Sequence, residues 1–409
     1  MEIQLASRMD AFQPGIFSVL NDKKRQRISE GKPVWDLSVG TPDFEPDEHV
    51  MKAVEEAVKV PFNYTYALND LPELTEAVQG WYERRYGVVL APEEIASVNG
   101  SQEGIAHIAW TICDPGDIVL VPNPGYPIFS VGPELCGAKL ACYDLLEENH
   151  YLPDLSAIPE ELARKAKAMV VSYPLNPVCK TAPRSFYEEL VRFAKRYNII
   201  IIHDNAYSEI VYDGREGGSF LSVPGAKEVG IEFNSLSKSY CLTGARISFV
   251  MGNRQIVQKF KTLRSQIDYG IFRPVQLAGI AALNGPRTAW SGVERSISAG
   301  GTPCAGASVP SGGTCRTARA ACLPGRLCPR ALPTPSGSAR SFWSRPDCSA
   351  HPVSPSALWA RDMSALPWSY LWRRSRRSSL QWTPAASSGS KRRKGAYLCL
   401  LITHFWPNS

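Results

Sequence analysis

The stretch Ser235–Val250, SLSKSYCLTGARISFV, places one lysine between two serines and an arginine eight residues after that lysine. A short, mainly apolar run follows the arginine directly. On these residues alone, Lys238 can be an ordinary solvated charge, because lysine is almost never fully buried without a partner. The segments that come before Ser235 therefore decide how this stretch is interpreted.

Apolar residues recur in two patterns between residues 45 and 285. Short, nearly continuous apolar runs are typical of strands buried on both faces of a parallel sheet, and they occupy residues 117–123, 168–174, 198–205 and 245–252. Spacings of three and four residues are typical of amphipathic helices, and they occupy residues 47–58, 71–87 and 185–197. The alternation predicts an α/β fold, a mainly parallel sheet flanked by helices, with ligands at the carboxyl ends of the strands.

The composition excludes several classes of protein. A chain of 409 residues is long enough for a large domain and a smaller one. Its eleven cysteines form neither a C-x-x-C pair nor a Cys/His cluster at metal-ligand spacing, so we expect reduced thiols and no metal. The N-terminus lacks a signal-peptide pattern, and no apolar run approaches about 18 residues. We therefore expect a cytoplasmic protein with no membrane partner.

The charge is distributed unevenly along the chain. Residues 286–409 contain 17 Lys and Arg against 3 Asp and Glu, a net charge of +14, whereas residues 1–285 carry a net charge of −8. The overall value of +6 averages these two regions, so it does not indicate a nucleic-acid partner.

The character of the sequence also changes near Gly285. The later segment is rich in Arg, Ser, Pro, Cys and Trp and lacks helical and strand periodicity, although natural disordered segments are poor in aromatic residues. Our hypothesis is an out-of-frame translation that begins close to Gly285, which predicts that residues 286–409 are not natively folded. The alternative is a genuine basic tail that binds RNA or a membrane surface.

Residues 35–285 resemble a class I/II aminotransferase of the aspartate aminotransferase-like fold, which depends on pyridoxal 5′-phosphate (PLP). The motifs that carry the resemblance stand in the order of that family: NGSQEG, YPLNP, HDNAY and SLSKSYCLTGAR. The resemblance implies that residues 1–45 are the N-terminal segment of a small domain. It also implies that residues 46–285 form the PLP-binding large domain.

Lys238 matches the lysine that forms a Schiff base with the cofactor aldehyde. Once substrate displaces it, such an amine can move a proton between the substrate α-carbon and the cofactor. Arg246 matches the arginine that binds the cofactor phosphate, and Ser235 and Ser237 match its hydroxyl partners. A phosphate dianion needs fixed donors of this kind.

The NGSQEG motif matches the phosphate-binding loop of the family, through Gly100, Ser101 and Gln102. Backbone N–H groups at the start of a helix bind phosphate readily, although a plain glycine-rich turn also fits these residues. Tyr126, in GYPIF, matches the aromatic residue that stacks on the cofactor ring. Its alternative role is packing in the core.

Asp204 matches the carboxylate that pairs with the pyridine nitrogen and makes the ring an electron sink; its alternative is to cap the turn after a strand. Tyr207 matches the phenol that binds the cofactor 3′-oxygen, and Asn176 matches the asparagine that reaches this oxygen and the substrate carboxylate. The family usually continues with Thr-Gly, whereas this chain has Val178 and Cys179. Neither residue takes positive φ as readily as glycine, so the turn that follows is in doubt.

Two features near the N-terminus also match the family. Gly40 matches the glycine whose backbone lies against the substrate. A tyrosine of YTYALNDLPEL is implied to reach the phosphate of the neighbouring subunit, and we choose Tyr66 ahead of Tyr64. The family usually has a glycine before PEL, where this chain has Asp70 and Leu71.

The resemblance predicts PLP-dependent transfer of an amino group between an amino acid and a 2-oxo acid by a homodimer. Family members bind the substrate α-carboxylate through an arginine of the C-terminal small domain, and no arginine of the tail stands in a matching motif. Substrate positioning is therefore the property that we expect to suffer most. Two alternatives stay open: a PLP-dependent β-lyase on the same scaffold, and a non-catalytic remnant.

Overall fold

The computed structural model describes residues 3–32, 34, 39–42, 44–211 and 217–286 of the chain. These residues divide into two compact units, and the division lies between Val39 and Gly40. The tail that we predict to be out of frame lies outside the described residues from position 287 onward, so that hypothesis stays a prediction. The domain boundary predicted at residue 45 likewise stays a prediction.

The first unit contains a short 3₁₀ helix, η1 (Ser7–Ala11), and one α-helix, α1 (Ile16–Ser29). Neither helix has a buried residue, and Met9 and Ile28 are among their exposed apolar side chains. A helix of this length is marginal in water by itself.

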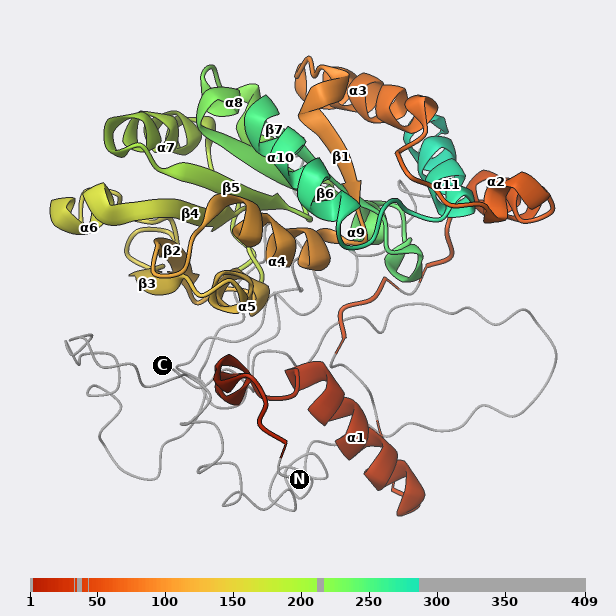
Figure 1. Ribbon diagram of the computed structural model, residues 1–409, viewed down its shortest axis with the longest axis horizontal. Helices are drawn as coiled ribbons and strands as arrows, with labels where there is room; N and C mark the ends of the chain where they lie inside the picture. The colour runs from red at the N-terminus through yellow and green to blue at the C-terminus, as the bar shows by residue number, and fades with distance from the viewer. Residues whose placement is uncertain (1–2, 33, 35–38, 43, 212–216, 287–409) are drawn as a thin grey trace, which may run out of the picture. The chain divides into compact units, whose positions relative to one another are not determined.

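The second unit is built on a seven-stranded sheet with the order β1-β7-β6-β5-β4-β2-β3 (Figure 1). Adjacent strands from β3 through β6 are parallel, and β7 is antiparallel to both β6 and β1. The predicted mainly parallel sheet is therefore confirmed. The strands are β1 (Ile95–Val98), β2 (Ile118–Asn123), β3 (Lys139–Asp144), β4 (Ala166–Ser172), β5 (Ile200–Asn205), β6 (Gly230–Ser235) and β7 (Ser248–Gly252).

Helices flank this sheet, as predicted. The α-helices are α2 (Glu48–Ala57), α3 (Pro72–Tyr86), α4 (Ser101–Ile112), α5 (Ile128–Leu135), α6 (Glu160–Lys165), α7 (Arg184–Tyr197), α8 (Ala226–Val229), α9 (Leu236–Ser239), α10 (Arg254–Ser265) and α11 (Arg273–Asn284). Four 3₁₀ helices complete the unit: η2 (Pro61–Tyr64), η3 (Pro92–Glu94), η4 (Phe220–Ser222) and η5 (Thr243–Ala245). No helix in the described part of the chain is long and apolar enough to span a membrane.

The sequence explains where the predicted helices begin and end. Helix α3 starts with Pro72, whose missing N–H is not needed in the first turn, and it ends at Gly87 in the left-handed conformation. Helix α7 ends in the same way at Asn198, a residue type that tolerates positive φ. These two helices, together with α2, confirm the three segments with helical spacing.

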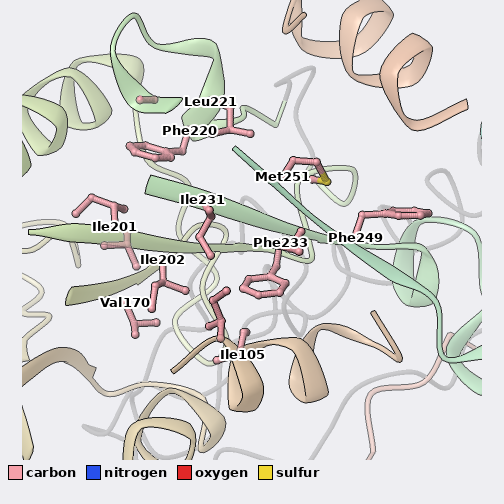
Figure 2. Close-up of a cluster of buried hydrophobic side chains, with 14 of the residues drawn as sticks. Ile105, Val170, Ile201, Ile202, Phe220, Leu221, Ile231, Phe233, Phe249 and Met251 are labelled. Atoms are coloured by element: carbon pink, nitrogen blue, oxygen red, sulfur yellow. The ribbon is translucent and has the colours of Figure 1, made fainter. Parts of the chain in front are cut away.

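Apolar side chains fill the space between the sheet and the helices on both sides (Figure 2). On one side, Phe233 of β6 lies close to Ile105 of α4, and on the other side Phe220 and Leu221 cover the sheet. All four side chains are buried. Burial at roughly 25 cal/mol per Å² of apolar surface is the main force that holds these layers together.

The register of the strands brings the residues after each strand to one edge of the sheet. Ser172 at the end of β4 is paired with Asp204, and Ser235 at the end of β6 is paired with Ser248 at the start of β7. Val98 at the end of β1 is paired with the same Ser248. The turns that follow β1, β4, β5 and β6 therefore meet at this edge, where ligands bind in open α/β sheets.

Candidate active site

Lys238 lies on the single-turn helix α9, directly after β6, and is half-buried. Its Nζ donates a hydrogen bond to the backbone carbonyl of Gly40. Burial lowers the pKa of the Lys238 amine, and the positive charge of Arg246 lowers it further. A lowered pKa increases the neutral fraction, which is the nucleophilic form of the amine. The structure therefore brings together Lys238 and Gly40, two of the predicted site residues.

The predicted Ser235 lies three residues before this lysine, where its hydroxyl contacts the backbone of Ser237 and the hydroxyl of Ser248. The Ser235 hydroxyl oxygen accepts the backbone N–H of Ser237 at 3.1 Å and the hydroxyl of Ser248 at 2.7 Å. Because Ser235 acts as acceptor in both bonds, its own O–H hydrogen is available to a third group. This donor is the feature that a phosphate oxygen requires.

Arg246 and Gly100 lie in contact at the same edge. The guanidinium of Arg246 donates to the carbonyls of Thr243 at 3.2 Å and Asn99 at 3.4 Å. Gly100 has φ +90°, and a Cβ at this position would collide with the Arg246 guanidinium. The positive φ is what requires glycine here, since the guanidinium is the end of a long side chain and can move away from a Cβ. The arrangement makes one cationic cradle from two distant segments.

The other members of the predicted phosphate loop begin helix α4. The hydroxyl oxygen of Ser101 is buried and has no hydrogen-bond partner among the described residues. Gln102 accepts a hydrogen bond of 3.1 Å from the Tyr126 hydroxyl. Burial raises the pKa of Tyr126, Asp204 raises it further, and Arg246 opposes them, so these three groups are within electrostatic reach of one another.

Asp204 lies at the end of β5 and is only 8% exposed. One carboxylate oxygen, Oδ1, has no hydrogen-bond partner in the described part of the chain. Burial raises the pKa of Asp204 to about 7, and the negative charge of Glu232 contributes to the shift. A buried carboxylate without a partner is unfavourable. Asp204 is therefore suited to receive a protonated or cationic group that the chain itself does not supply.

Asn176 and Tyr207 follow the two central strands at this edge. Tyr207 lies in the turn after β5, and Asn176 lies in the loop after β4, where both are half-buried. In that loop the backbone of Cys179 has φ +55°, the conformation that glycine would take, and its N–H donates to the Leu175 carbonyl at 2.7 Å. The turn forms without glycine, and the backbone of a buried cysteine takes the strained conformation.

The two candidate tyrosines for a neighbouring subunit differ in their contacts. The Tyr64 hydroxyl donates to the Val58 carbonyl of its own chain at 2.8 Å. Tyr66 is 81% exposed against 63% for Tyr64, and its ring meets the ring of Tyr269 edge-on at 6.0 Å. Tyr66 is therefore the freer of the two to leave the surface of its own subunit.

Glu232 is a buried group near the site that sequence reasoning missed. Its carboxylate accepts hydrogen bonds from the Tyr82 hydroxyl, the Ser219 hydroxyl and the Phe220 N–H, each at 2.8 Å. The His203 ring, one residue before Asp204, lies 2.9 Å from the same carboxylate. The available signal was a charged residue between two large apolar ones, Ile231 and Phe233.

A second missed group supports the phosphate loop. Asn99 precedes Gly100 directly, and its side-chain amide donates to Asp268 at 2.7 Å. Asp268 in turn is paired with Arg264, four residues earlier. The available signal was this i,i+4 pair of opposite charges. No group of three or more potential metal ligands occurs among the residues that the structure describes.

This fold and this edge of the sheet define a PLP-dependent aminotransferase. The chain matches the family model "Aminotransferase class I and II" over residues 32–296 and belongs to that family. It is therefore a PLP-dependent transferase whose substrates are an amino acid and a 2-oxo acid. Amino-group transfer is supported by the relatives described next, and nothing in these comparisons supports the β-lyase alternative.

Among proteins of known function, the chain is similar to the LL-diaminopimelate aminotransferase of Desulforudis audaxviator, with 44% identity over 284 residues, 69% of this chain and 72% of the relative. The LL-diaminopimelate aminotransferase of Moorella thermoacetica is 43% identical over 295 residues, 72% of this chain and 76% of the relative. Among solved structures, substrate-bound BacF from Bacillus subtilis has a TM-score of 0.72 and 34% identity, covering 75% of this chain and 77% of that one.

The residues present at this edge fit PLP. The buried, unpartnered Oδ1 of Asp204 suits a protonated pyridine nitrogen. The unpartnered hydroxyl of Ser101, the free hydrogen of Ser235 and the guanidinium of Arg246 suit a phosphate dianion. Lys238 supplies an amine of lowered pKa for the aldehyde.

Proposed function

We propose that Lys238, Asp204 and Arg246 hold PLP at the carboxyl edge of the sheet. The observation that carries this proposal is the buried Asp204 carboxylate, which lacks a partner for Oδ1 at the edge that also has a lysine of lowered pKa and a cationic cradle. When bound, PLP supplies an aldehyde that captures the substrate amine and a ring that accepts the electron pair left at the α-carbon.

Each side chain then has a distinct task. Lys238 would take the proton from the substrate α-carbon and deliver it to the carbon that was the cofactor aldehyde, and its lowered pKa leaves more of the amine free to act as a base. Asp204 keeps a proton on the pyridine nitrogen. Tyr126 stacks on the ring, and Tyr207 and Asn176 bind the 3′-oxygen, with Asn176 and the backbone of Gly40 also next to the substrate. The phosphate is bound by Gly100, Ser101, Gln102, Ser235, Ser237 and Arg246, with Tyr66 from the neighbouring subunit.

The test is to incubate the full-length chain with PLP, reduce it with borohydride and map the modified lysine. Lys238→Ala should abolish both the label and amino-group transfer. Lys261→Ala is the matched control, because burial also lowers the pKa of this lysine although it lies on α10, away from the proposed cradle. A pyridoxyl group on Lys261, or one that persists in Lys238→Ala, would contradict the assignment.

We further propose that the amino donor is a diamino dicarboxylic acid of the LL-diaminopimelate type. The support is the 44% and 43% identity to two enzymes of that name. Solved relatives with other names are less similar, such as the aspartate aminotransferase of Rhizobium meliloti at 25% identity and a TM-score of 0.69, covering 74% of this chain and 76% of that one.

Substrate choice is tested by comparing kcat/KM for LL-diaminopimelate, aspartate and an aromatic amino acid with one common 2-oxo acid. The proposal predicts the highest value for LL-diaminopimelate. A higher value for aspartate would replace the proposed donor without affecting the cofactor site. Release of pyruvate and ammonia from a β-substituted amino acid would instead revive the β-lyase alternative.

We also propose that the enzyme is a homodimer in which Tyr66 completes the site of its partner. The support is a surface of exposed aromatic side chains beside the α10–α11 turn: Phe62, Tyr64, Tyr66, Tyr269 and Phe272. Arg273 holds the backbone of this segment through the carbonyls of Phe62, Thr65 and Tyr66. A large exposed aromatic patch is typical of an interaction surface.

Mixing two inactive variants tests the dimer. Tyr66→Ala and Lys238→Ala should each be inactive, and a mixed dimer should regain activity because one of its two sites has both residues intact. Tyr64→Phe is the control, because it removes only the bond to Val58 in its own chain. Failure of the mixture to recover activity, when sedimentation shows mixed dimers, would exclude Tyr66 as the shared residue.

The tail of the chain is a separate proposal. The family match ends at residue 296, whereas the chain continues to residue 409 with the composition described above. We propose that translation leaves the original frame close to Gly285, so that the small-domain arginine is not encoded. Resequencing codons 280–290 and translating all frames downstream tests this. An intact frame without an aminotransferase-like alternative would overturn it.

The enzyme is proposed to work in the cytoplasm. The support is that Cys113 and Cys136, which are both buried, form no disulfide with any residue that the structure describes. Reduced thiols are typical of reducing compartments. Cell fractionation followed by detection of the chain checks the location, and recovery in a secreted fraction would contradict it.

A further inference from the structure

The turn between β1 and α4 is held at three points through Asn99, the residue before the proposed phosphate loop. The backbone N–H of Asn99 donates to Glu103 at 2.9 Å, and its carbonyl accepts from Arg246 at 3.4 Å. Its side-chain amide donates to Asp268 at 2.7 Å. Of these three contacts, only the bond to Asp268 depends on the side chain being asparagine.

An ion pair between buried Arg264 and half-buried Asp268 anchors that side chain. Arg264 of α10 is 5% exposed and forms a fork with Asp268, through Nε at 3.2 Å and Nη2 at 3.0 Å. The remaining guanidinium nitrogen, Nη1, donates to the backbone carbonyl of Ser97 in β1. A two-point pairing of planar groups fixes orientation as well as distance. Asn99 is therefore bound to a carboxylate whose orientation is fixed by Arg264.

Asp70 fixes the same strand from the other side. Its carboxylate accepts the backbone N–H of Ser97 at 2.8 Å and also the Ser97 hydroxyl. Ser97 is thus held through its N–H, its hydroxyl and its carbonyl, two residues before Asn99. Asp70 stands where the resemblance leads one to expect glycine, so this contact is a feature of this chain.

We propose that Asn99 is a positioning residue for the cofactor phosphate. Arg246 is exposed, and its hydrogen bonds to the carbonyls of Thr243 and Asn99 are rather long, at 3.2 and 3.4 Å. The Asn99–Asp268 bond sets where the Asn99 carbonyl lies, and that carbonyl in turn holds the guanidinium over Gly100. Asn99 thereby couples the phosphate-binding arginine to the Arg264–Asp268 pair. This inference rests on the proposed cofactor site.

The test compares two ligands that differ only in the phosphate. Dissociation constants of PLP and of pyridoxal are measured by equilibrium dialysis with the full-length wild-type chain and with Asn99→Ala. The variant should bind PLP about 10-fold more weakly, the lower end of what loss of an outer supporting group costs at metal sites. Pyridoxal affinity should not fall in parallel, because the affected contacts bind the phosphate.

Asn253→Ala is the matched control. Its side chain also makes several bonds, to the N–H groups of Gln255 and Ile256 and to the Lys227 carbonyl, but it lies at the opposite edge of the sheet, after β7. It should lower stability without changing the ratio of the two dissociation constants. Asn99→Ser repeats the measurement if Asn99→Ala unfolds at the working temperature.

The possible outcomes distinguish the positioning role of Asn99 from the proposed cofactor site on which it rests. Equal weakening of both ligands by Asn99→Ala, or no weakening of PLP, overturns the positioning role while the cofactor site stands. If the wild-type chain binds PLP no more tightly than pyridoxal, the proposed phosphate cradle itself fails. A ratio that changes in Asn99→Ala and stays constant in Asn253→Ala supports the inference.

Discussion

Two carboxylates are buried in neighbouring strands of the sheet, and their surroundings are opposite. Glu232 of β6 accepts bonds from Tyr82, Ser219 and Phe220 and lies against the ring of His203. Asp204 of β5 has an oxygen with no partner among the described residues. A buried carboxylate whose oxygens accept hydrogen bonds from the chain stabilises the fold, whereas a buried carboxylate oxygen without such a donor indicates a ligand-binding site.

Strand β5 contributes to the surroundings of both carboxylates, because side chains alternate between the two faces of the sheet along a strand. His203 and Asp204 are consecutive in β5, so their side chains point to opposite faces of the sheet. The edge that carries Asp204 also has strained backbone, since Cys179 and Arg246 have φ +55° without being glycine, although His150 and Tyr151 elsewhere share this conformation. Strain of this kind is tolerated where the surroundings hold it, and it gathers at functional sites.

Asp204→Asn should produce the largest effect. The amide cannot pair with a protonated pyridine nitrogen as a carboxylate does, and we expect kcat to fall by about 10² to 10³-fold, the cost of losing one preorganised electrostatic partner. Steady-state kinetics with saturating PLP measure this loss. Because the variant no longer buries a charge, its cofactor-free form should unfold at higher urea than the wild type above pH 7.

If Asp204→Asn keeps the wild-type kcat, the unpartnered carboxylate does not bind the cofactor. The distinction drawn between Asp204 and Glu232 would then be wrong. A lower rate accompanied by lower stability would mean that Asp204, like Glu232, serves the fold.

Glu232→Gln should show the converse behaviour. The amide leaves one acceptor oxygen and presents N–H groups to donors, so we expect a loss of about 3 kcal/mol in the free energy of unfolding, since at least one buried donor loses its acceptor. Urea unfolding measures this, with Glu228→Gln as control. Glu228 is exposed and bound to Lys195, and its replacement should cost under about 1 kcal/mol. A large fall in kcat with unchanged stability would reverse the roles of the two carboxylates.

The pH dependence of stability should reveal Asp204 directly. Its pKa is raised from 3.8 to about 7 by burial, with Glu232 second, so the folded state without cofactor binds a proton that the unfolded state has released. The contribution of Asp204 to stability is complete below pH 4 and is lost as the pH rises through 7. Between pH 5 and 8 we expect the wild type to lose about 2 to 3 kcal/mol relative to Asp204→Asn. Parallel curves for the two proteins would show that the carboxylate titrates normally.

The strands that could be predicted from the sequence differ from those that were missed in the residues that they bury. The runs that became β2, β4, β5 and β7 are nearly continuous in apolar residues, because the middle of a parallel sheet is covered on both faces. Strand β6 was missed because Glu232 interrupts it, and the hydrogen bonds that make this tolerable come from residues distant in the sequence. Strand β3 lies at the edge of the sheet with mostly exposed or half-buried residues, and β1 has only four residues.

The residues proposed to contact the cofactor could be predicted from the sequence, whereas the residues that position them could not. Lys238, Asp204 and Arg246 stand in motifs with family counterparts, and the register of the strands brings their segments to one edge. Asn99 stands in the NGSQEG motif but was assigned no role, and Asp70 departs from the family pattern. The importance of both depends on partners more than 20 residues away, at Asp268 and Ser97. Long-range pairs of this kind are set by tertiary packing, and local pattern does not indicate them.

The smallest predicted effect concerns backbone strain at the edge of the sheet that carries the proposed cofactor site. Cys179→Gly should be about 0.5 to 1 kcal/mol more stable than Cys179→Ala, because glycine relieves the left-handed backbone while the greater freedom of its unfolded chain offsets part of the gain. Urea unfolding of the two variants measures the difference, since both lack the thiol. At Asn198, which also has positive φ but ends helix α7, the same Gly-to-Ala comparison isolates an ordinary helix end. If the alanine and glycine variants at position 179 have the same free energy of unfolding, the backbone is not strained there. The contrast between the surroundings of Asp204 and those of Glu232 then rests on the two carboxylates alone.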